Sequence, residues 1–356
     1  MAASRPLLAL AMGDPAGISP ELTAKLLADE AVAAAADLVV IGDRRVLAAG
    51  ESVAGVKART EPWIPRKAVG GGHTFVDLAH LDPTRIARGA SSKEGGAFAL
   101  RNFRTALALG RDGVVDAVTF TPFNKHAMKL AAGSYEDEIA VISEVTGTKG
   151  HGREFNILGA LWNARVTSHV PLKDVAKYIT REAVVNGLVL TDRCMKEAGV
   201  ARPRIAVAGL NPHAGDEGNF GREEIDVIAP AVVEAKAKGI ACEGPFPSDT
   251  VFLRAKRGDF DAVQTMYHDQ GQIAMKLMGF ESGITLIGGY AFPVCTPAHG
   301  TAYDIAGKGI ADLGASRNAI LIAAKMVSQR KGAPASSSDR AAALARSLDA
   351  AKGQAA

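Results

Sequence analysis

The sequence predicts an α/β protein of two α/β/α domains, each built on a mostly parallel sheet. Three observations lead to this prediction. Several short runs rich in Val and Ile end in Gly, Asp, Asn or Pro, which is typical of buried strands. Longer segments with the helical spacing of apolar residues lie between these runs. The length of 356 residues fits roughly two domains of about 150 residues each.

The expected strands and helices alternate along the chain. Strands are expected at residues 7–12, 38–42, 117–121, 155–161, 205–210, 262–267 and 284–287. Helices are expected at residues 21–29, 95–109, 182–197, 223–237 and 316–327. The first helix follows a loop in which Ser19 is the expected N-cap and Pro20 the first helical residue. Ligands of parallel sheets bind at the carboxyl ends of the strands, so we expect the site in the loops that follow them.

The composition disfavours several classes of protein. The chain has 41 Lys and Arg against 38 Asp and Glu, and a net charge of +3 gives no electrostatic footprint for nucleic acid or for an anionic membrane. No apolar run is long enough to predict a transmembrane helix. Three widely spaced cysteines predict neither a disulfide framework nor a zinc ribbon, and a cytoplasmic location is expected. Residues 332–339 have a linker composition and an Ala-rich stretch after them is expected to form a weak helix, so residues 331–356 are expected to be a flexible tail.

Three histidines, His169, His213 and His268, each come shortly after an expected strand. Parallel strands would direct these side chains into one crevice. Imidazole is a ligand of zinc, nickel, cobalt and iron, and three protein ligands leave a coordination position open for substrate. The spacing is not a metal motif in itself, and an isolated histidine is more often an ordinary core or surface residue. Both interpretations stay open on the residues alone.

Two further loops combine glycine with polar side chains. Residues 299–309 include His299 and Asp304 and suit either nucleotide binding or a glycine-rich turn. Neither a GxGxxG that opens a helix nor a P-loop is present in the sequence. Lys125 follows the expected strand 117–121 and is either a proton donor, an anion-binding group or a solvated lysine at a helix start.

Together these segments resemble the 4-hydroxythreonine-4-phosphate dehydrogenase family of pyridoxal phosphate biosynthesis. The resemblance covers nearly the whole chain, and it is carried in order by residues 13–17, 167–172, 211–215, 267–271 and 299–309. It implies the fold of isocitrate and isopropylmalate dehydrogenases, with a cleft between the two domains. The expected domains are residues 1–131 with 288–330, which hold the nucleotide-binding loop, and residues 132–287, which hold the metal, substrate and dimer contacts.

The resemblance also implies a reaction. It implies a homodimer with the active site shared between subunits, in which His169, His213 and His268 bind one divalent metal and one histidine comes from the partner chain. The metal would be zinc, magnesium, cobalt, nickel or manganese. With NAD as the oxidant, a secondary alcohol beta to a carboxylate becomes a ketone, and the beta-keto acid then loses CO2. The residues implied to bind NAD are Gly13, Asp14, His299, Gly300, Thr301, Ala302 and Asp304.

Four residues receive catalytic or substrate-binding roles from the resemblance. Lys125 is the expected proton relay. Lys276 matches a lysine that binds an anionic group of the substrate. Asp249 and Asp269 are expected as carboxylates of the pocket or behind the metal ligands.

The chain departs from the biosynthetic enzymes at expected substrate contacts. Glu138 and Ile139 stand where the family has His and Thr, although an acidic run here is also typical of a solvated helix start. Thr285 stands at an Asn position and Val294 at an Arg position, and neither replacement supplies the charge that holds a phosphate. We therefore expect a substrate other than 4-phosphohydroxythreonine in its usual pose.

Catabolic relatives provide the alternatives. One relative oxidises and decarboxylates the cis-dihydrodiol of terephthalate, and it shares the missing Arg and the Ile-Gly-Gly at residues 287–289. Another acts on four-carbon sugar-acid phosphates. A non-catalytic relative that binds a metabolite or a metal is the hypothesis from another class.

Overall fold

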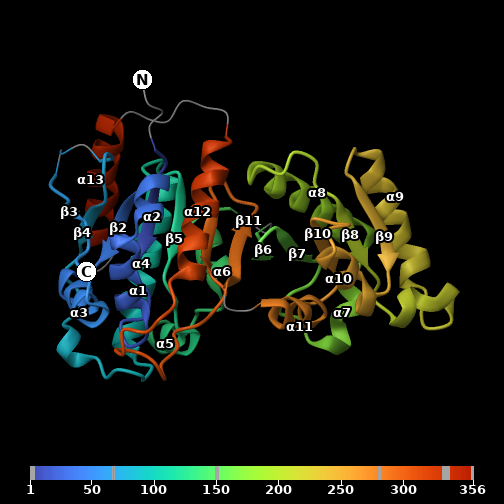
Figure 1. Ribbon diagram of the computed structural model, residues 1–356, viewed down its shortest axis with the longest axis horizontal. Coiled ribbons are helices and arrows are strands. Elements are labelled where there is room, and N and C mark those ends of the chain that lie inside the picture. Colours follow the sequence, from blue (N-terminus) through green and yellow to red (C-terminus); the bar gives the residue numbers. More distant parts are fainter. Residues whose placement is uncertain are drawn as a thin grey trace. The chain divides into compact units, whose positions relative to one another are not determined.

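The computed structural model describes residues 5–65, 67, 69–148, 152–279, 282–330 and 337–353, which form two compact units (Figure 1). The first unit comprises Met1–Gly152 and Tyr290–Ala356, and the second comprises Arg153–Gly289. The sequence placed the first boundary at residue 131. The structure moves it to residue 152, because α6 (Glu138–Thr146) packs on α4 (Lys93–Arg111), where Arg104 donates two hydrogen bonds to Glu144.

The first unit is built on a parallel sheet with the strand order β3-β4-β2-β1-β5-β12. The central strands are fully buried, which explains their continuous apolar sequences. The strands are β1 (Leu7–Ala11), β2 (Asp37–Gly42), β3 (Glu61–Pro62), β4 (Thr74–Asp77), β5 (Ala117–Phe120) and β12 (Val294–Pro297).

Helices α4 and α12 both contact β1 and β5. The other helices of this unit are α1 (Ser19–Ala28), α2 (Glu30–Ala35), α3 (Arg44–Ala54), α5 (Lys125–Ala131) and α13 (Ser337–Gly353); α12 spans Gly314–Ser328. The expectation that Ser19 caps the first helix is wrong. Ile18 occupies the cap, and the Ser19 hydroxyl accepts a hydrogen bond of 2.8 Å from the Gly13 amide.

The C-terminal segment contains the Ala-rich helix that the sequence predicted, but this helix is attached to the first unit, unlike a flexible tail. Ser337–Gly353 forms helix α13, which packs against α4. Arg340 donates to the Asp116 carboxylate at 2.7 Å and to the Val114 carbonyl at 3.0 Å, so an ion pair fastens this helix to the first unit. Residues 331–336 and 354–356, which belong to the same predicted tail, lie outside the described residues.

The second unit has the strand order β11-β6-β7-β10-β8-β9, in which β7, β10, β8 and β9 are parallel. β6 runs antiparallel to both β7 and β11. The single strand expected at residues 155–161 is therefore a hairpin, which turns at Gly159 with a left-handed φ of 57°. The strands are β6 (Arg153–Leu158), β7 (Leu161–Arg165), β8 (Ile205–Ala208), β9 (Cys242–Phe246), β10 (Ala262–Thr265) and β11 (Ile284–Gly288).

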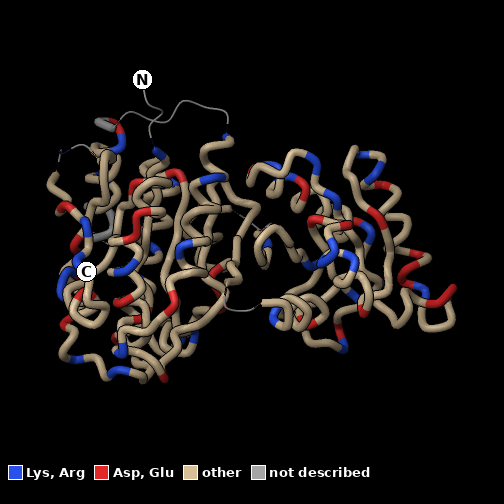
Figure 2. The backbone as a smooth tube through the Cα atoms, in the orientation of Figure 1, with Lys and Arg blue, Asp and Glu red and all other residues tan. Residues whose placement is uncertain are grey.

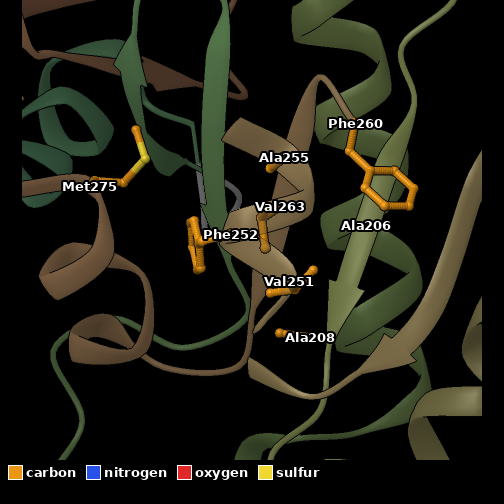
Figure 3. Packing of buried hydrophobic residues seen from close by; sticks show 8 residues of the cluster. All are labelled: Ala206, Ala208, Val251, Phe252, Ala255, Phe260, Val263 and Met275. Atoms are coloured by element: carbon orange, nitrogen blue, oxygen red, sulfur yellow. The ribbon is translucent and has the colours of Figure 1, made fainter. Parts of the chain in front are cut away.

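Apolar side chains from β8 and β10 meet those of α10 and α11 in one core of this unit (Figure 3). The cluster contains Ala206, Ala208, Val251, Phe252, Ala255, Phe260, Val263 and Met275. The helices are α7 (Val175–Tyr178), α8 (Arg181–Glu197), α9 (Ala229–Ala237), α10 (Ser248–Lys256) and α11 (His268–Gly279). This packing attaches α11 to β10, and the candidate site lies at the carboxyl end of that strand.

Charged residues of both signs are interspersed along both units (Figure 2). This distribution agrees with the small net charge of +3. Within the described part of the chain, no helix combines the length and the apolar composition that crossing a membrane requires.

Asp43 supplies a testable constraint on this fold. Its carboxylate accepts from the backbone amides of Arg45 at 3.0 Å, where it caps α3, and of Leu81 at 2.9 Å. Burial acts to raise the pKa of Asp43, but the hydrogen bonds from Arg45 and Leu81 outweigh it and lower the pKa from 3.8 to about 2. The ionised carboxylate therefore stabilises the fold above about pH 4, and this contribution is lost as the pH falls toward 2.

We expect Asp43→Asn to lower the free energy of unfolding at neutral pH by about 1–3 kcal/mol, because the amide keeps one acceptor but places a donor against the Arg45 side chain and the Leu81 amide. The difference from the native protein should shrink between about pH 4 and pH 2, and urea unfolding over this range measures it. Asp226→Asn is the control, because that carboxylate only pairs with the exposed Arg222. A difference that is independent of pH would contradict the assigned role.

Candidate functional site

Two of the three predicted metal ligands lie side by side. His169 follows β7 and His268 opens α11 directly after β10, and these strands are parallel neighbours whose last residues, Arg165 and Thr265, are paired. The imidazole ring centroids of His169 and His268 are 6.0 Å apart. The structure therefore brings together two imidazoles at the carboxyl edge of the second unit's sheet, where the sequence predicted a site.

Asp269 controls the tautomer of the second imidazole. Its carboxylate lies 2.7 Å from Nδ1 of His268. A carboxylate can only accept a hydrogen bond, so Nδ1 carries the proton and Nε2 keeps its lone pair for a ligand. The Asp269 side chain is itself 72% exposed. It acts from the solvent side of the imidazole, as carboxylates behind metal-binding histidines do.

His213 stands apart from this pair in the structure of one chain. It lies after β8 in the turn Pro212–Gly218, and its ring is 6.1 Å from the ring of Phe220. The described residues contain no group of three or more His, Cys, Asp or Glu side chains close enough to hold a metal ion. The three predicted ligands are thus not assembled within one chain.

The turn that carries His213 has an uncommon backbone. Five consecutive residues, 213–217, have φ values between 44° and 84°, in the left-handed region that residues other than glycine rarely adopt. At Gly215 a Cβ atom would lie 2.8 Å from the Glu224 carboxylate, so glycine is required by close approach as well as by φ. A left-handed run of this kind is maintained only by strong local contacts.

The buried carboxylate of Glu224 holds the segment that leads into this turn. It accepts hydrogen bonds of 2.7 Å from the backbone amides of both Leu210 and Asn211, and one of 2.9 Å from the Asn211 side chain. The Gln270 amide joins the same loop to the His268 segment. Its nitrogen donates to the Gly209 carbonyl, and its oxygen accepts from the Met266 amide, each at 2.7 Å. Sequence analysis missed Glu224, which it placed in a helix, and gave Gln270 no role.

Lys125 and Glu138 are brought together in the first unit. Asn124 caps α5 and Asp137 caps α6, so that Lys125 and Glu138 are the first residues of their helices. The Lys125 ammonium lies 3.2 Å from the Glu138 carboxylate, with the lysine side chain 54% exposed and that of the glutamate 11% exposed. The predicted proton relay therefore has an acidic partner that extends from the protein interior.

The neighbouring Ile139 contributes its backbone to this region. Its carbonyl accepts a hydrogen bond of 3.2 Å from the Tyr290 hydroxyl, which also bonds to Ser143 at 2.8 Å. The Tyr290 contacts fasten the start of α6 to the chain just before β12. The Asp137 cap and the Tyr290 contacts therefore both hold the start of α6, and this fixes the position of Glu138.

The predicted nucleotide-binding residues are linked by a buried carboxyl group. The Asp14 carboxylate accepts a hydrogen bond of 2.8 Å from the Ala16 backbone amide and one of 2.5 Å from the Tyr303 hydroxyl. Burial raises the pKa of Asp14, and the hydrogen bonds from Tyr303 and Ala16 oppose that rise. The Thr301 carbonyl accepts from the Ile18 amide at 3.0 Å, which attaches the same loop to the start of α1.

Helix α1 anchors the rest of the loop after β12. The buried Glu21 carboxylate accepts from the amides of Gly309 and Ala311, and the Lys25 ammonium donates to the carbonyls of the same two residues. Gly13 sits where a Cβ would come within 2.3 Å of the Thr121 and Pro122 carbonyls. Between these anchors the remaining predicted nucleotide-binding residues are His299, Gly300, Ala302 and Asp304, of which Gly300 and Asp304 are exposed and Ala302 has a φ of 43°.

The remaining predicted substrate residues lie in different surroundings. Thr285 is on β11, where its hydroxyl accepts a hydrogen bond of 3.3 Å from the side-chain amide of Asn156. Val294 is 0% exposed in β12 and pairs with Val118 in the core of the first unit. Lys276 on α11 and Asp249 on α10 are both exposed. Val294 is therefore an interior residue and not a lining residue of an open site.

A family model described as pyridoxal phosphate biosynthetic protein PdxA matches residues 34–323. The chain belongs to the PdxA family. A Rhizobium meliloti relative, provisionally named 4-hydroxythreonine-4-phosphate dehydrogenase 2, is 59% identical over 330 residues, which cover 92% of this chain and 95% of the relative. A Symbiobacterium thermophilum relative, provisionally named D-threonate 4-phosphate dehydrogenase, is 38% identical over 326 residues, which cover 90% and 97%.

Solved structures agree with this assignment. The 4-hydroxythreonine-4-phosphate dehydrogenase of Klebsiella pneumoniae has a TM-score of 0.78 and 34% identity, and the match covers 92% of this chain and 99% of that one. Terephthalate 1,2-cis-dihydrodiol dehydrogenase of Burkholderia xenovorans has a TM-score of 0.63 and 27% identity, and the match covers 89% of this chain and 98% of that one. The predicted PdxA-type family, the α/β class and a dehydrogenase are confirmed. The assigned NAD-binding and metal-binding residues stay predictions.

The role of Glu224 can be tested directly in this PdxA-family chain. Glu224→Gln places an amide donor against the Asn211 side chain, and we expect the free energy of unfolding to fall by about 1–3 kcal/mol. Amide hydrogen exchange should accelerate at residues 209–217, measured by mass spectrometry. Glu223→Gln is a matched control, because Glu223 accepts only from the Asn211 side chain. Equal effects of the two substitutions would rule out the special role of Glu224.

Proposed function

We propose that this chain catalyses the oxidation of a 3-hydroxy acid at its secondary alcohol, with NAD and a divalent metal, followed by decarboxylation of the beta-keto acid. The observation that carries the proposal is the His169–His268 pair at the carboxyl ends of neighbouring parallel strands in a member of the PdxA family. Dehydrogenase names of relatives at 38–59% identity support the reaction type.

The donor set fits a divalent metal. The His268 tautomer fixed by Asp269 leaves Nε2 available, and imidazole nitrogen suits zinc, cobalt or nickel better than magnesium, which prefers oxygen ligands. His169, His213 and His268 would hold the ion, with one of the three supplied by a second copy of the chain, since one chain does not assemble them. We therefore propose a homodimer whose sites are shared.

NAD would be held in the first unit. The proposed contacts are Gly13 with Asp14 and the anchored loop with His299, Gly300, Thr301, Ala302 and Asp304, where exposed Gly300 leaves open space. When bound, NAD would supply the hydride acceptor and the divalent metal would supply polarisation of the alcohol oxygen. Because Glu21 and Lys25 hold this loop by four hydrogen bonds, its shape is set before a nucleotide arrives.

Lys125 is the proposed proton carrier. Once its ammonium has released a proton to solvent, the amine can take the hydroxyl proton as the alcohol becomes a ketone, and the ammonium formed in this way can protonate the carbon from which CO2 departs. The Glu138 carboxylate, 3.2 Å from the Lys125 ammonium, orients that group and balances its charge. Lys276 would bind the anionic group of the substrate, and Asp249 would line the pocket.

The proposed substrate differs from 4-phosphohydroxythreonine. Val294 is a core residue and cannot contact a phosphate, and Thr285 offers a single uncharged hydroxyl, which accepts from Asn156. Glu138 and Ile139 in place of His and Thr add a carboxylate and an apolar side chain, so less positive charge surrounds the substrate. The second candidate is a four-carbon sugar-acid phosphate, favoured by the relative named D-threonate 4-phosphate dehydrogenase. The third candidate is a cis-dihydrodiol carboxylate, which the similarity to the terephthalate 1,2-cis-dihydrodiol dehydrogenase structure supports at 27% identity.

NADH formation and CO2 release across a panel of acids test this proposal. The panel contains 4-phosphohydroxythreonine, D-threonate with and without its 4-phosphate, and a carboxylated cis-dihydrodiol. We expect another acid to exceed 4-phosphohydroxythreonine by at least about tenfold in kcat/KM, because a lost arginine–phosphate contact costs more than 1.4 kcal/mol. Chelation should abolish turnover and zinc should restore it.

Two results would overturn the proposal in different ways. Equal or faster turnover of 4-phosphohydroxythreonine would refute the argument from Thr285 and Val294. Failure of every acid, together with absent NAD binding by calorimetry, would favour a non-catalytic relative that binds a metabolite or a metal.

The lysine provides a separate prediction. Lys125→Met should lower kcat by about 10²–10⁴-fold, the usual contribution of a general acid or base, while zinc affinity stays unchanged. Lys129→Met removes an exposed lysine one turn further along α5 and should leave kcat close to that of the native protein. Turnover of the Lys125 variant within threefold of native would remove this residue from the mechanism.

A further inference from the structure

A buried network of polar side chains occupies the second unit beneath the histidine pair. Its centre is Arg165, the last residue of β7, whose side chain is 2% exposed. The guanidinium donates to the Ser168 hydroxyl at 2.9 Å, to the Asn156 side-chain oxygen at 2.7 Å and to the Glu154 carboxylate. These bonds join the β6–β7 hairpin to the turn that carries His169.

Asn156 extends the network to two more elements. Its amide nitrogen donates to the Thr285 hydroxyl on β11, and its oxygen accepts a second hydrogen bond, of 2.8 Å, from Gln272 on α11. Gln272 lies four residues after His268 and four before Lys276, so the three side chains follow one stripe of the helix. The contact with Asn156 thereby fixes the rotation of the stripe that bears His268 and Lys276.

Stability alone explains this arrangement poorly. Removing an Arg–Glu pair from water costs several kcal/mol per ion, and apolar replacements of buried pairs are often neutral or stabilising. A fully bonded polar network instead selects one geometry, because any other leaves buried donors unpaired. Arginine suits this task, since its planar fork directs several donors in fixed directions where lysine offers a point charge.

We propose that Arg165 is a positioning residue, and that the Glu154–Arg165–Asn156 network sets the placement of His169 and His268 relative to Thr285. It contacts neither a metal nor a substrate. It reaches the His169 turn through Ser168, the His268 helix through Gln272 and the substrate position through Thr285. This inference rests on the proposed metal-dependent function.

Zinc binding by the full-length apo protein is the direct test. Arg165→Lys keeps the positive charge beside Glu154 but loses the guanidinium hydrogen bonds to Ser168 and Asn156. We expect the Kd for zinc, measured by competition with a chromophoric chelator, to rise about tenfold or more, as it does when groups behind metal ligands are altered. Arg204→Lys is the matched control, because Arg204 makes an exposed forked pair with Asp261 in the same unit.

A second variant separates positioning from folding. Glu154→Gln/Arg165→Met removes both buried charges at once, so neither ion is left unpaired, and Tm should stay close to native. The zinc Kd should nevertheless rise, because the donors to Ser168 and Asn156 are gone. Rises in Kd only in variants with a lowered Tm would reduce Arg165 to a structural residue and overturn the inference.

Zinc binding by the native protein separates a failure of the positioning role of Arg165 from a failure of the proposed metal-dependent function. If it binds zinc, and His169→Ala abolishes that binding, unchanged affinity in both Arg165 variants overturns the positioning role and leaves the proposed function intact. If the native protein binds no zinc, the metal-dependent function fails, and the inference fails with it.

Discussion

The candidate site depends on one constraint: the parallel strands β7, β10 and β8 are paired in a register that ends all three at the same edge of the sheet. In this parallel register Arg165 pairs with Thr265 and Gln264 pairs with Val207, so all three strands finish at one edge of the sheet. The segments that leave this edge carry His169, His268 and His213. Residues separated by about 100 positions in sequence become neighbours because parallel pairing requires long crossovers between adjacent strands.

Buried carboxylates then determine the shapes of the loops at the strand ends. Glu224, Glu21 and Asp14 each accept backbone amides that a loop would otherwise leave unpaired. A carboxylate suits this role because it offers only acceptors, whereas an unpaired loop presents amide donors. Both proposed binding regions are thus held by the protein itself, which is the arrangement that rapid and specific binding requires.

Sequence reasoning recovered the fold class and most central strands because buried parallel strands read as continuous apolar runs. It missed the short strands β3 and β4, and also β9 and β12, whose sequences contain Pro. It merged β6 with β7 because Gly159 and Ala160 interrupt the apolar run so briefly. The histidines were visible as polar residues after strands. The Arg165 network was not, since its bonds join residues up to 129 positions apart. Charged and amide residues inside the runs of β6 and β7 were the available signal.

The division of the chain has a consequence for its synthesis. The second unit is continuous, whereas the first is completed only by Tyr290–Ala356. As the polypeptide leaves the ribosome, β5 has no partner on one side until β12 emerges some 170 residues later. An unpaired strand edge is a template for aggregation. A nascent chain of this protein therefore carries an open sheet edge for about half of its translation, and a truncated product that lacks β12 keeps that edge permanently.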